Sequence, residues 1–436
     1  MATLWMFVCV FLCLSILSQS TVPSSQTFKY VNEGEFGDYI SEYGANYRIL
    51  PIGAFPFQFC FYNSTPNAFY LALRMGHPRS ESMLRWVWEA NRNDPVRENA
   101  TLTFGRDGNL VLADADGRVA WSTGTANKGV VGLRLLPTGN LVLYNRRGGF
   151  VWQSFDHPTD TLLVGQSLRI NGPNKLVARK SDADASPGIY SLVMESGGLA
   201  MYANVSSSRS LSYYNYSDGL LAVSRPPASL TFDSSPDTEE AYAFDLTLNI
   251  QISPSSPYGN FIFARPKYNA TLSFLRLESD GNLRIYTYYD KVDYRAWEVP
   301  FAFFDDEKGW LNGCRLPAKC GSLGVCEDEM CVACPQPQGL LGWSRNCSVP
   351  KVAAASCKKG GSVEYYKVAG VENFITAYVK SRGAMKGAEC RKKCSQDCSC
   401  AGYFYWEESS QCWLAPVIGT LEKVSIASHS AYIKYS

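Results

Sequence analysis

With 436 residues, the chain is too long for one ordinary domain, so several domains are expected. Its charge is nearly balanced, with 41 basic residues against 40 acidic ones, which excludes the basic field that nucleic acids and anionic membranes select. Aromatic residues make up 13% of the chain, and 26 Tyr, 35 Gly and 22 Pro are typical of an all-β protein with many turns.

The first 20 residues, MATLWMFVCVFLCLSILSQS, form an apolar run that ends in small residues. This pattern predicts a secretory signal peptide over residues 1–20, with cleavage near Ser20. A membrane anchor is the alternative, but the run is short and ends in Ser and Gln. No later segment is apolar enough to span a bilayer, so we expect a secreted, soluble mature protein.

Short runs of alternating apolar residues, separated by Gly, Asp and Asn turns, fill residues 45 to 300 and predict β-strands. One phrase recurs, because GRDGNLVLA around Asn109 is followed about 31 residues later by LPTGNLVLY around Asn140. Weaker copies are MESGGLAMY from Met194 and ESDGNLRIY from Glu278. The four copies indicate two tandem β-domains. The stretches SDADASPG and VSRPPASLTFDSSPDTEE are expected to be exposed loops of the second domain.

The stretch ADADG at residues 113–117 resembles the start of a calcium loop, with Asp114 and Asp116 as its first acidic residues. Such a loop needs a Glu at a fixed later spacing, and residues 119–121 are Val, Ala and Trp. We therefore expect an Asp-Gly hairpin turn.

Twelve of the 15 cysteines lie between Cys314 and Cys412, which predicts disulfides and an oxidising compartment. The spacing of Cys331 and Cys334 formally fits zinc, but thiols oxidise in a secreted chain and no His lies near, so disulfides are favoured and no metal or cofactor is expected. Cys60 stands alone, as either a buried free thiol or one partner of an intermolecular disulfide.

The cysteine-rich region divides in two. Residues 314–347 contain too few apolar residues to bury a sufficient core, so disulfides must stabilise them. The stretch KVAAAS is expected to be a linker. Cys390 and Cys394 lie four residues apart, and on a helix both thiols would share one face and could staple it to adjoining strands.

Six N-x-S/T sequons in a chain with a signal peptide predict a glycoprotein. They begin at Asn63, Asn99, Asn204, Asn215, Asn269 and Asn346.

The segments WEANRNDPV, GRDGNLVLADADGRVAWST and VWQSFDHPTDTLLVGQSL resemble the bulb-type lectin domain of plant S-locus glycoproteins and related receptor kinases. CGSLGVC is similar to the EGF-like region of that family, and the last segment is similar to its PAN/apple domain. Within this family the chain is most similar to the epidermis-specific secreted glycoproteins. The resemblance implies a mainly β chain with two β-prism II-like lectin domains at residues 28–168 and 169–305. An EGF-like module at 306–350 and a small α+β PAN/apple domain with one helix at 351–436 would follow.

The resemblance also implies a mannose motif, Q-x-D-x-N-x-V-x-Y, whose alternate residues share one face of a strand and meet the sugar. No copy here is complete. The sugar-binding candidates are Asp107, Asn109 and Val111 in one copy, Asn140, Val142 and Tyr144 in the next, and Glu278, Asp280, Asn282 and Tyr286 in the last.

The last copy keeps the most polar groups, so we expect it to bind sugar if any copy does. Arg284 replaces its Val and would either close the site by pairing with Glu278 or direct it toward an acidic sugar. The alternative for Asp107 and Asn109 is turn chemistry, and the alternative for the last copy is an ordinary solvated strand face.

For the cysteines, the resemblance to PAN domains implies the pairs Cys390–Cys412, Cys394–Cys400 and Cys357–Cys398. For the EGF-like module it implies Cys314–Cys326, Cys320–Cys331 and Cys334–Cys347.

These features predict a secreted cell-wall glycoprotein that binds mannose-type or acidic glycans, or another glycoprotein, through a depleted lectin motif. The alternative is an extracellular signalling partner of a protein or receptor without lectin activity. No Ser/His/Asp set, His-rich metal motif or glycine-rich phosphate loop indicates an enzyme, and neither nucleic acid nor a membrane is expected as a partner.

Overall fold

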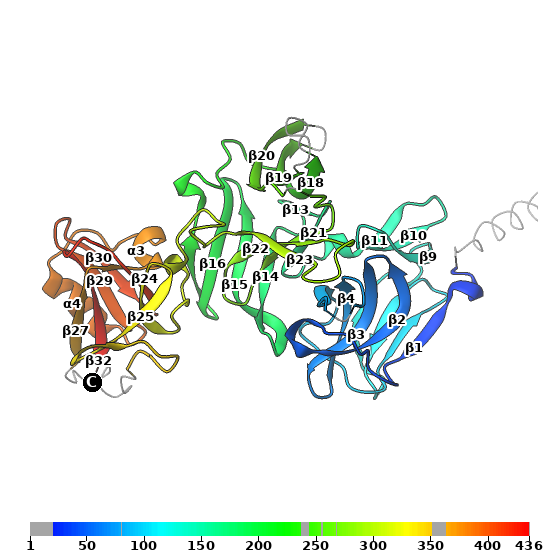
Figure 1. The fold of residues 1–436 in the computed structure, drawn as a ribbon, viewed down its shortest axis with the longest axis horizontal. Helices are drawn as coiled ribbons and strands as arrows, with labels where there is room; N and C mark the ends of the chain where they lie inside the picture. Colours follow the sequence, from blue (N-terminus) through cyan, green and yellow to red (C-terminus); the bar gives the residue numbers. More distant parts are fainter. Residues whose placement is uncertain are drawn as a thin grey trace, which may run out of the picture. The chain divides into compact units, whose positions relative to one another are not determined.

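The computed structural model describes residues 21–79, 81–236, 244–253, 256–266, 268–350 and 363–435, and these residues form a mainly β protein, as predicted (Figure 1). The expected signal peptide at residues 1–20 lies outside the described residues. None of the helices in the described segments is long and apolar enough to cross a membrane.

The chain forms two compact units. The first contains the chain up to Ser167 together with Ser181–Pro187 and Tyr288–Glu298, and the second contains Leu168–Lys180, Gly188–Thr287 and Val299–Ser436. The expected boundaries of the four modules stay a prediction.

Three antiparallel sheets build the first unit. Their strands, in order across each sheet, are β2 (Asn46–Ala54), β3 (Phe57–Thr65), β4 (Ala68–Met75) and β5 (Arg85–Glu89); β1 (Phe28–Val31), β6 (Thr101–Phe104), β7 (Leu110–Ala113) and β8 (Val119–Ser122); and β11 (Phe150–Gln153), β10 (Leu141–Asn145) and β9 (Val130–Leu135). The short strand β12 (Thr161–Leu163) follows. Alternation puts Leu110 and Leu112 of β7 in the core and Val111 on the outer face.

Each of the three sheets of the first unit contributes one tryptophan from an edge strand, and the three tryptophans form a cluster. The rings of Trp88, Trp121 and Trp152 lie edge to face, with centroids 5.8–6.2 Å apart. Trp88 Nε1 also donates to the backbone oxygen of His157, whose ring stacks on Trp152. Because aromatic rings supply large apolar area, this cluster joins the three sheets of the prism.

The sheet of β2–β5 is covered on both faces. On the face away from the tryptophan cluster, Tyr62 stacks on Trp86, and this pair packs with the buried Tyr47, Cys60 and Ala185. Burial raises the pKa of the Cys60 thiol to about 12. Cys60 is therefore a buried free thiol, and the intermolecular disulfide is excluded because its sulfur is enclosed.

A second set of three sheets follows, mostly in the second unit. The strands are β14 (Lys175–Ser181), β15 (Asp184–Glu195), β16 (Gly198–Ser206) and β17 (Arg209–Tyr214); β13 (Ser167–Arg169), β18 (Ser229–Pro236), β19 (Phe244–Ser253) and β20 (Ser256–Ala264); and β21 (Ser273–Leu277), β22 (Leu283–Tyr288) and β23 (Trp297–Ala302). The expectation of two exposed loops was wrong for residues 184–188 and 229–236, which lie in β15 and β18. Ladder pairing of residues 229–236 with β19, and the place of β15 between β14 and β16 in its sheet, override the turn-forming composition.

Five disulfides join the C-terminal cysteines in the described residues: Cys314–Cys326, Cys320–Cys331, Cys334–Cys347, Cys390–Cys412 and Cys394–Cys400. These are five of the six pairs that the resemblance implies. For the sixth, Cys398 is disulfide-bonded and Cys357 lies outside the described residues. Since Cys331 and Cys334 belong to separate disulfides, they do not form a zinc site.

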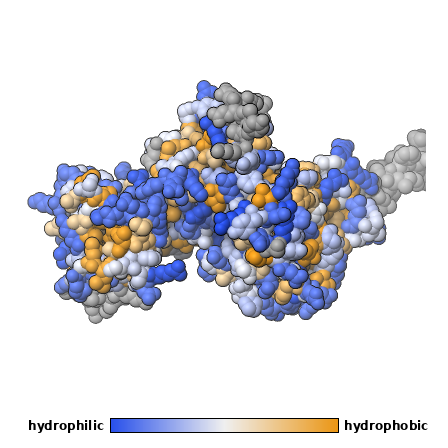
Figure 2. Space-filling model, viewed as in Figure 1, coloured by the Kyte–Doolittle hydropathy of each residue, from blue (hydrophilic) through white to orange (hydrophobic). Residues whose placement is uncertain are grey.

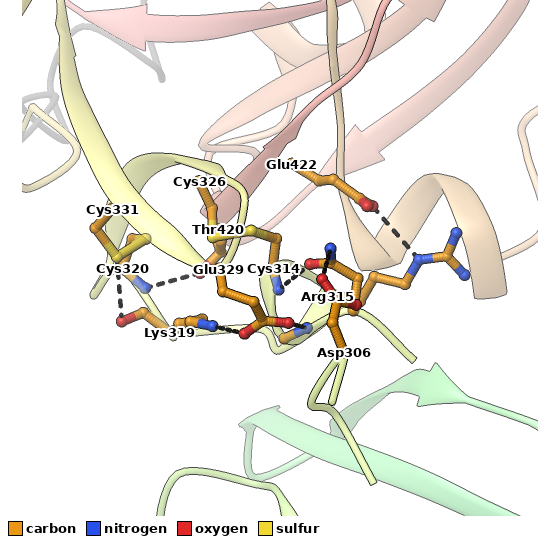
Figure 3. Close-up of a disulfide and its surroundings, with 12 residues drawn as sticks. Asp306, Cys314, Arg315, Lys319, Cys320, Cys326, Glu329, Cys331, Thr420 and Glu422 are labelled. Carbon is orange, nitrogen blue, oxygen red and sulfur yellow. Dashed lines mark hydrogen bonds and ion pairs between the residues drawn. A yellow bond between two sulfur atoms is a disulfide. The ribbon is translucent and has the colours of Figure 1, made fainter. Parts of the chain in front are cut away.

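The EGF-like and PAN regions share one five-stranded sheet, although each keeps its own disulfides. Its order is β26 (Gly339–Gly342), β25 (Met330–Gln336), β24 (Leu323–Glu327), β31 (Gly419–Lys423) and β28 (Val371–Glu372). Figure 3 shows the junction, where Cys320 N donates to Thr420 Oγ1 at 3.0 Å and Arg315 pairs with Glu422 at 3.5 Å. The cysteine-rich segment thus completes its sheet with a strand about 100 residues later.

The C-terminal region contains two helices in its described part, α3 (Phe374–Tyr378) and α4 (Gly387–Gln396), where the resemblance implied one. They accompany the sheet of β27 (Glu364–Ala369), β32 (His429–Tyr435), β29 (Gly402–Trp406) and β30 (Gln411–Ala415). Cys390 and Cys394 share the buried face of α4, as predicted, and the Cys390–Cys412 disulfide staples the helix to β30. Buried Lys434 donates to three backbone oxygens near the end of α4, where a cation is favourable.

Candidate functional site

In the three repeats that contain Gly-Asn-Leu, the asparagine side chain forms a hydrogen bond with the backbone of a later segment of the chain. Asn109 Oδ1 accepts from Thr125 N at 3.0 Å, and Asn140 Oδ1 accepts from Phe155 N at 3.3 Å. Asn282 makes two such bonds, because its Oδ1 accepts from Phe304 N and its Nδ2 donates to Phe304 O, both at 3.0 Å. The repeated asparagine therefore has a structural role in all three copies, and the differences between the copies lie in the residues around it.

The β22 face, formed by Glu278, Asp280, Arg284 and Tyr286, is closed by its own polar groups. Arg284 donates to both oxygens of Asp280, at 3.0 and 2.7 Å, rather than to Glu278. Tyr286 donates its hydroxyl to Glu278 Oε1 at 2.7 Å, and the tyrosine is 8% exposed. Sugar hydroxyls would have to displace these bonds, so the polar groups that made this copy the preferred candidate are already engaged.

The β10 face, formed by Asn140, Val142 and Tyr144, is covered by side chains from its neighbours. The Arg134 guanidinium lies 5.4 Å from the centre of the Tyr144 ring, and Tyr144 packs over Gly132. Val142 is only 1% exposed, between Arg134 and Gln153 on the adjoining strands. Asn140 Nδ2 donates to Gln153 Oε1 at 2.8 Å. This copy presents no open polar set.

The β7 face, formed by Asp107, Asn109 and Val111, is the open one among these three copies. Asp107 is exposed, and Asn109 and Val111 are half-buried. Asp107 Oδ1 accepts from Asn109 N at 3.1 Å, and the Asn109 oxygen is used by Thr123 and Thr125. Asp107 Oδ2 and Asn109 Nδ2 make no hydrogen bond to the part of the chain that the structure describes. They remain available to a ligand.

The neighbours of Val111 complete a shallow surface of small side chains. Thr103 lies opposite Val111 on β6, Ser122 lies opposite it on β8, and Thr101 pairs with Ala113. The end of the hairpin is held by Asp114, which pairs with Arg97 at 2.8 Å and Arg118 at 3.5 Å. The ADADG stretch is therefore a hairpin turn, as expected, and its buried carboxylate is engaged by arginines.

The predicted glycosylation sites differ in access. Asn99, Asn204, Asn269 and Asn346 are exposed, and Asn215 is half-buried with its side chain capping a short helix. Asn63 is only 6% exposed on β3, a position that gives an attached glycan no room. We therefore retain the other five asparagines as proposed sites.

Sequence reasoning did not single out the tryptophan cluster. Its signal is the recurrence of VWEA, AWST and VWQS, each roughly one repeat after the last. For a metal site, no group of three or more His, Cys, Asp or Glu residues with suitable geometry occurs in the described residues.

Comparison with known proteins agrees with this architecture. The family described as D-mannose binding lectin matches residues 85–181. EP1-like glycoprotein 2 of Arabidopsis thaliana is 47% identical over 98% of this chain and 98% of its own length. The epidermis-specific secreted glycoprotein EP1 of Daucus carota is 51% identical over 77% of this chain and 90% of its own. A G-type lectin S-receptor-like serine/threonine-protein kinase of Arabidopsis thaliana is 28% identical over 75% of this chain but only 39% of the kinase.

The strand architecture and the matched lectin segment define a protein with a bulb-type lectin domain. The chain belongs to the family of EP1-like glycoproteins. Its more distant relatives include receptor kinases that carry the same kind of lectin region.

Proposed function

We propose that this protein is a secreted carbohydrate- or glycoprotein-binding module of the plant cell wall, and that it binds through the β7 face. The observation that carries the proposal is that Asp107 Oδ2 and the amide nitrogen Nδ2 of Asn109, beside half-buried Val111, make no hydrogen bond within the described residues. A carboxylate accepts and an amide donates, which suits a pair of sugar hydroxyls, while the valine methyls cover an apolar sugar edge.

The ligand chemistry follows from the charge of the face. Asp107 repels a uronate, so a neutral, mannose-type glycan fits β7 better than an acidic one. Arg284 on the β22 face would suit an acidic sugar, but Asp280 already occupies its guanidinium. Two or three hydrogen bonds of about 0.5–1.5 kcal/mol each support only weak binding at a single site. Useful affinity then requires several copies of the ligand or of the protein.

The test is a glycan array with the glycosylated, secreted protein displayed in many copies. Val111→Arg places a long cation over the β7 face without disturbing the core, because Val111 points outward. The matched control is Ile262→Arg, at an exposed aliphatic position on β20. We expect neutral glycans to bind the wild type and the control, and Val111→Arg to lose at least about tenfold. Equal binding by all three proteins would overturn the proposal.

A second candidate function, recognition of an extracellular protein, is favoured by the surface around β26. This strand lies at the edge of its sheet, and Met330, Leu340 and Leu341 are 62–64% exposed. Figure 2 shows hydrophobic residues gathered over the region where β25 lies. Apolar edge strands can pair with a partner strand. Blank glycan arrays, together with binding to a receptor ectodomain that Leu340→Lys abolishes, would favour this function over the first.

A further inference from the structure

An uncharged groove of about 850 Å³ crosses the second unit. It is lined by residues from β15 and β16, from the cysteine-rich segment and from the loop before β31, among them Ile189, Val205, Pro317, Val417 and Ile418. None of its lining residues carries a charge. Ile189 is 51% exposed, so the groove leaves apolar surface in contact with water. Apolar patches of this kind are usually covered in the functional protein.

Asn204 is itself one of the lining residues, and it begins the sequon Asn204-Val205-Ser206 near the end of β16. Its side chain is exposed and makes no hydrogen bond to any residue that the structure describes. Within the described residues, the Asn204 side-chain amide is therefore accessible for attachment of a glycan. Among the sequon asparagines only Asn204 lines the groove, although Ser348 of the sequon Asn346-Cys347-Ser348 also belongs to the lining.

We propose that the groove is the seat of the N-glycan attached to Asn204. The first sugars lie along Ile189 and Val205 with their C–H faces and acetyl methyl groups against the apolar wall, and their hydroxyls point to water. A neutral chitobiose core matches the uncharged lining. Because the glycan is covalently attached to a residue of the wall, its effective concentration is high and weak packing suffices to hold it. This inference is independent of the proposed sugar-binding face on β7.

A glycan in the groove would have a structural effect, because the groove wall is assembled from separate parts of the second unit, which include β15 and β16, the cysteine-rich segment, α3 and the loop before β31. Sugars that pack against Ile189, Pro317, Val417 and Ile418 would shield all of these apolar side chains from water. Losing the glycan would therefore expose apolar surface and weaken this part of the unit.

The experiment uses the full secreted chain made in plant cells. Glycopeptide mass spectrometry measures occupancy at Asn204, and the fluorescence of anilinonaphthalene sulfonate measures exposed apolar surface. Two variants remove the glycan by different routes: Asn204→Gln changes the acceptor, and Ser206→Ala removes the sequon but keeps the asparagine. The matched control is Asn269→Gln, an exposed sequon in the same unit that does not line the groove.

We expect Asn204 to be occupied and dye fluorescence to rise at least about threefold in both sequon variants, with no rise in the control. Trimming the folded wild type to one N-acetylglucosamine should also raise dye binding, because the sugars that cover the rest of the groove wall are removed after folding, and this separates shielding from any folding defect of the variants. An unoccupied Asn204, or equal dye binding by the wild type and Ser206→Ala, would overturn the proposal. So would high dye binding by the occupied wild type.

Discussion

The β7 and β22 faces come from the same repeated phrase, yet one is open and the other is closed. Both keep an Asp-Gly-Asn turn, and in both the asparagine fixes a later segment. The difference lies two residues further along, where β7 has Val111 and β22 has Arg284. The arginine reaches back to Asp280 and neutralises the carboxylate that the β7 face leaves free. The number of polar residues in a motif therefore does not measure an open site, because those residues can satisfy one another.

The largest expected effect concerns the asparagines themselves. Asn282→Ala removes both bonds to buried Phe304 and leaves a backbone N–H and C=O unpaired, so we expect a loss of about 2–4 kcal/mol in the free energy of unfolding. Asn109→Ala should lose less, about 1–2 kcal/mol, because Asn109 is only half-buried. Urea unfolding of each variant measures the difference. Equal losses would contradict the stronger anchoring of the β22 copy.

A smaller effect is expected from pH at the end of the β7 hairpin. Burial raises the pKa of Asp114, but hydrogen bonds from the backbone of Arg97 and Ala115 and from the Arg97 guanidinium outweigh it, so the pKa lies below its usual value. The contribution to stability is thus complete above the unfolded pKa of about 3.9 and disappears as the pH falls through the folded pKa.

Asp114→Asn should remove this pH dependence and lower the free energy of unfolding by about 1–2 kcal/mol near neutral pH. This value is below the usual contribution of hydrogen bonds to a charged group, because both arginines are half exposed and solvent screens their charges. Thermal unfolding from pH 6 to pH 2.5 measures it for both proteins. An unchanged acid slope in the variant would show that Asp114 does not anchor the hairpin.

The smallest effect on stability is expected at the β22 face. Arg284→Val breaks an ion pair whose Asp280 side chain is 47% exposed, so the free energy of unfolding should change by less than about 1 kcal/mol. The variant also restores the valine of the β7 copy and frees Asp280. Urea unfolding measures the first effect, and a change above about 2 kcal/mol would mean that Arg284 supports the fold as well as closing the face.

Much of the fold could be predicted from the sequence, because the strands follow from local sequence patterns and the C-terminal region is held by covalent disulfides. The turn-strand phrase predicted the strands, and the family resemblance implied the five disulfides found among the described residues. The shared sheet could not be predicted, since β24 and β31 pair although they lie far apart in the sequence, with Leu323 opposite Gly419. Residues 184–188 have a loop-like composition, yet they belong to β15, which lies between β14 and β16 in its sheet.

The candidate site was less predictable for the same reason. Nothing near Asn282 in the sequence indicates that Phe304 takes both of its hydrogen-bonding groups. The preference for the β22 copy rested on counting Glu278, Asp280 and Tyr286, and the structure pairs each of them within the chain. The tryptophan cluster depends on three sheets meeting, which no single stretch of sequence encodes.

Sugar binding at the open β7 face is tested most directly with one immobilised neutral, mannose-type glycan and the variants Val111→Arg and Arg284→Val, each compared with the wild type. If the β7 face binds sugar, Val111→Arg loses at least about tenfold in affinity, which corresponds to about 1.4 kcal/mol, and Arg284→Val binds as well as the wild type or better. If Val111→Arg binds normally and Arg284→Val loses binding, the β22 face is the site and the assignment to β7 is wrong.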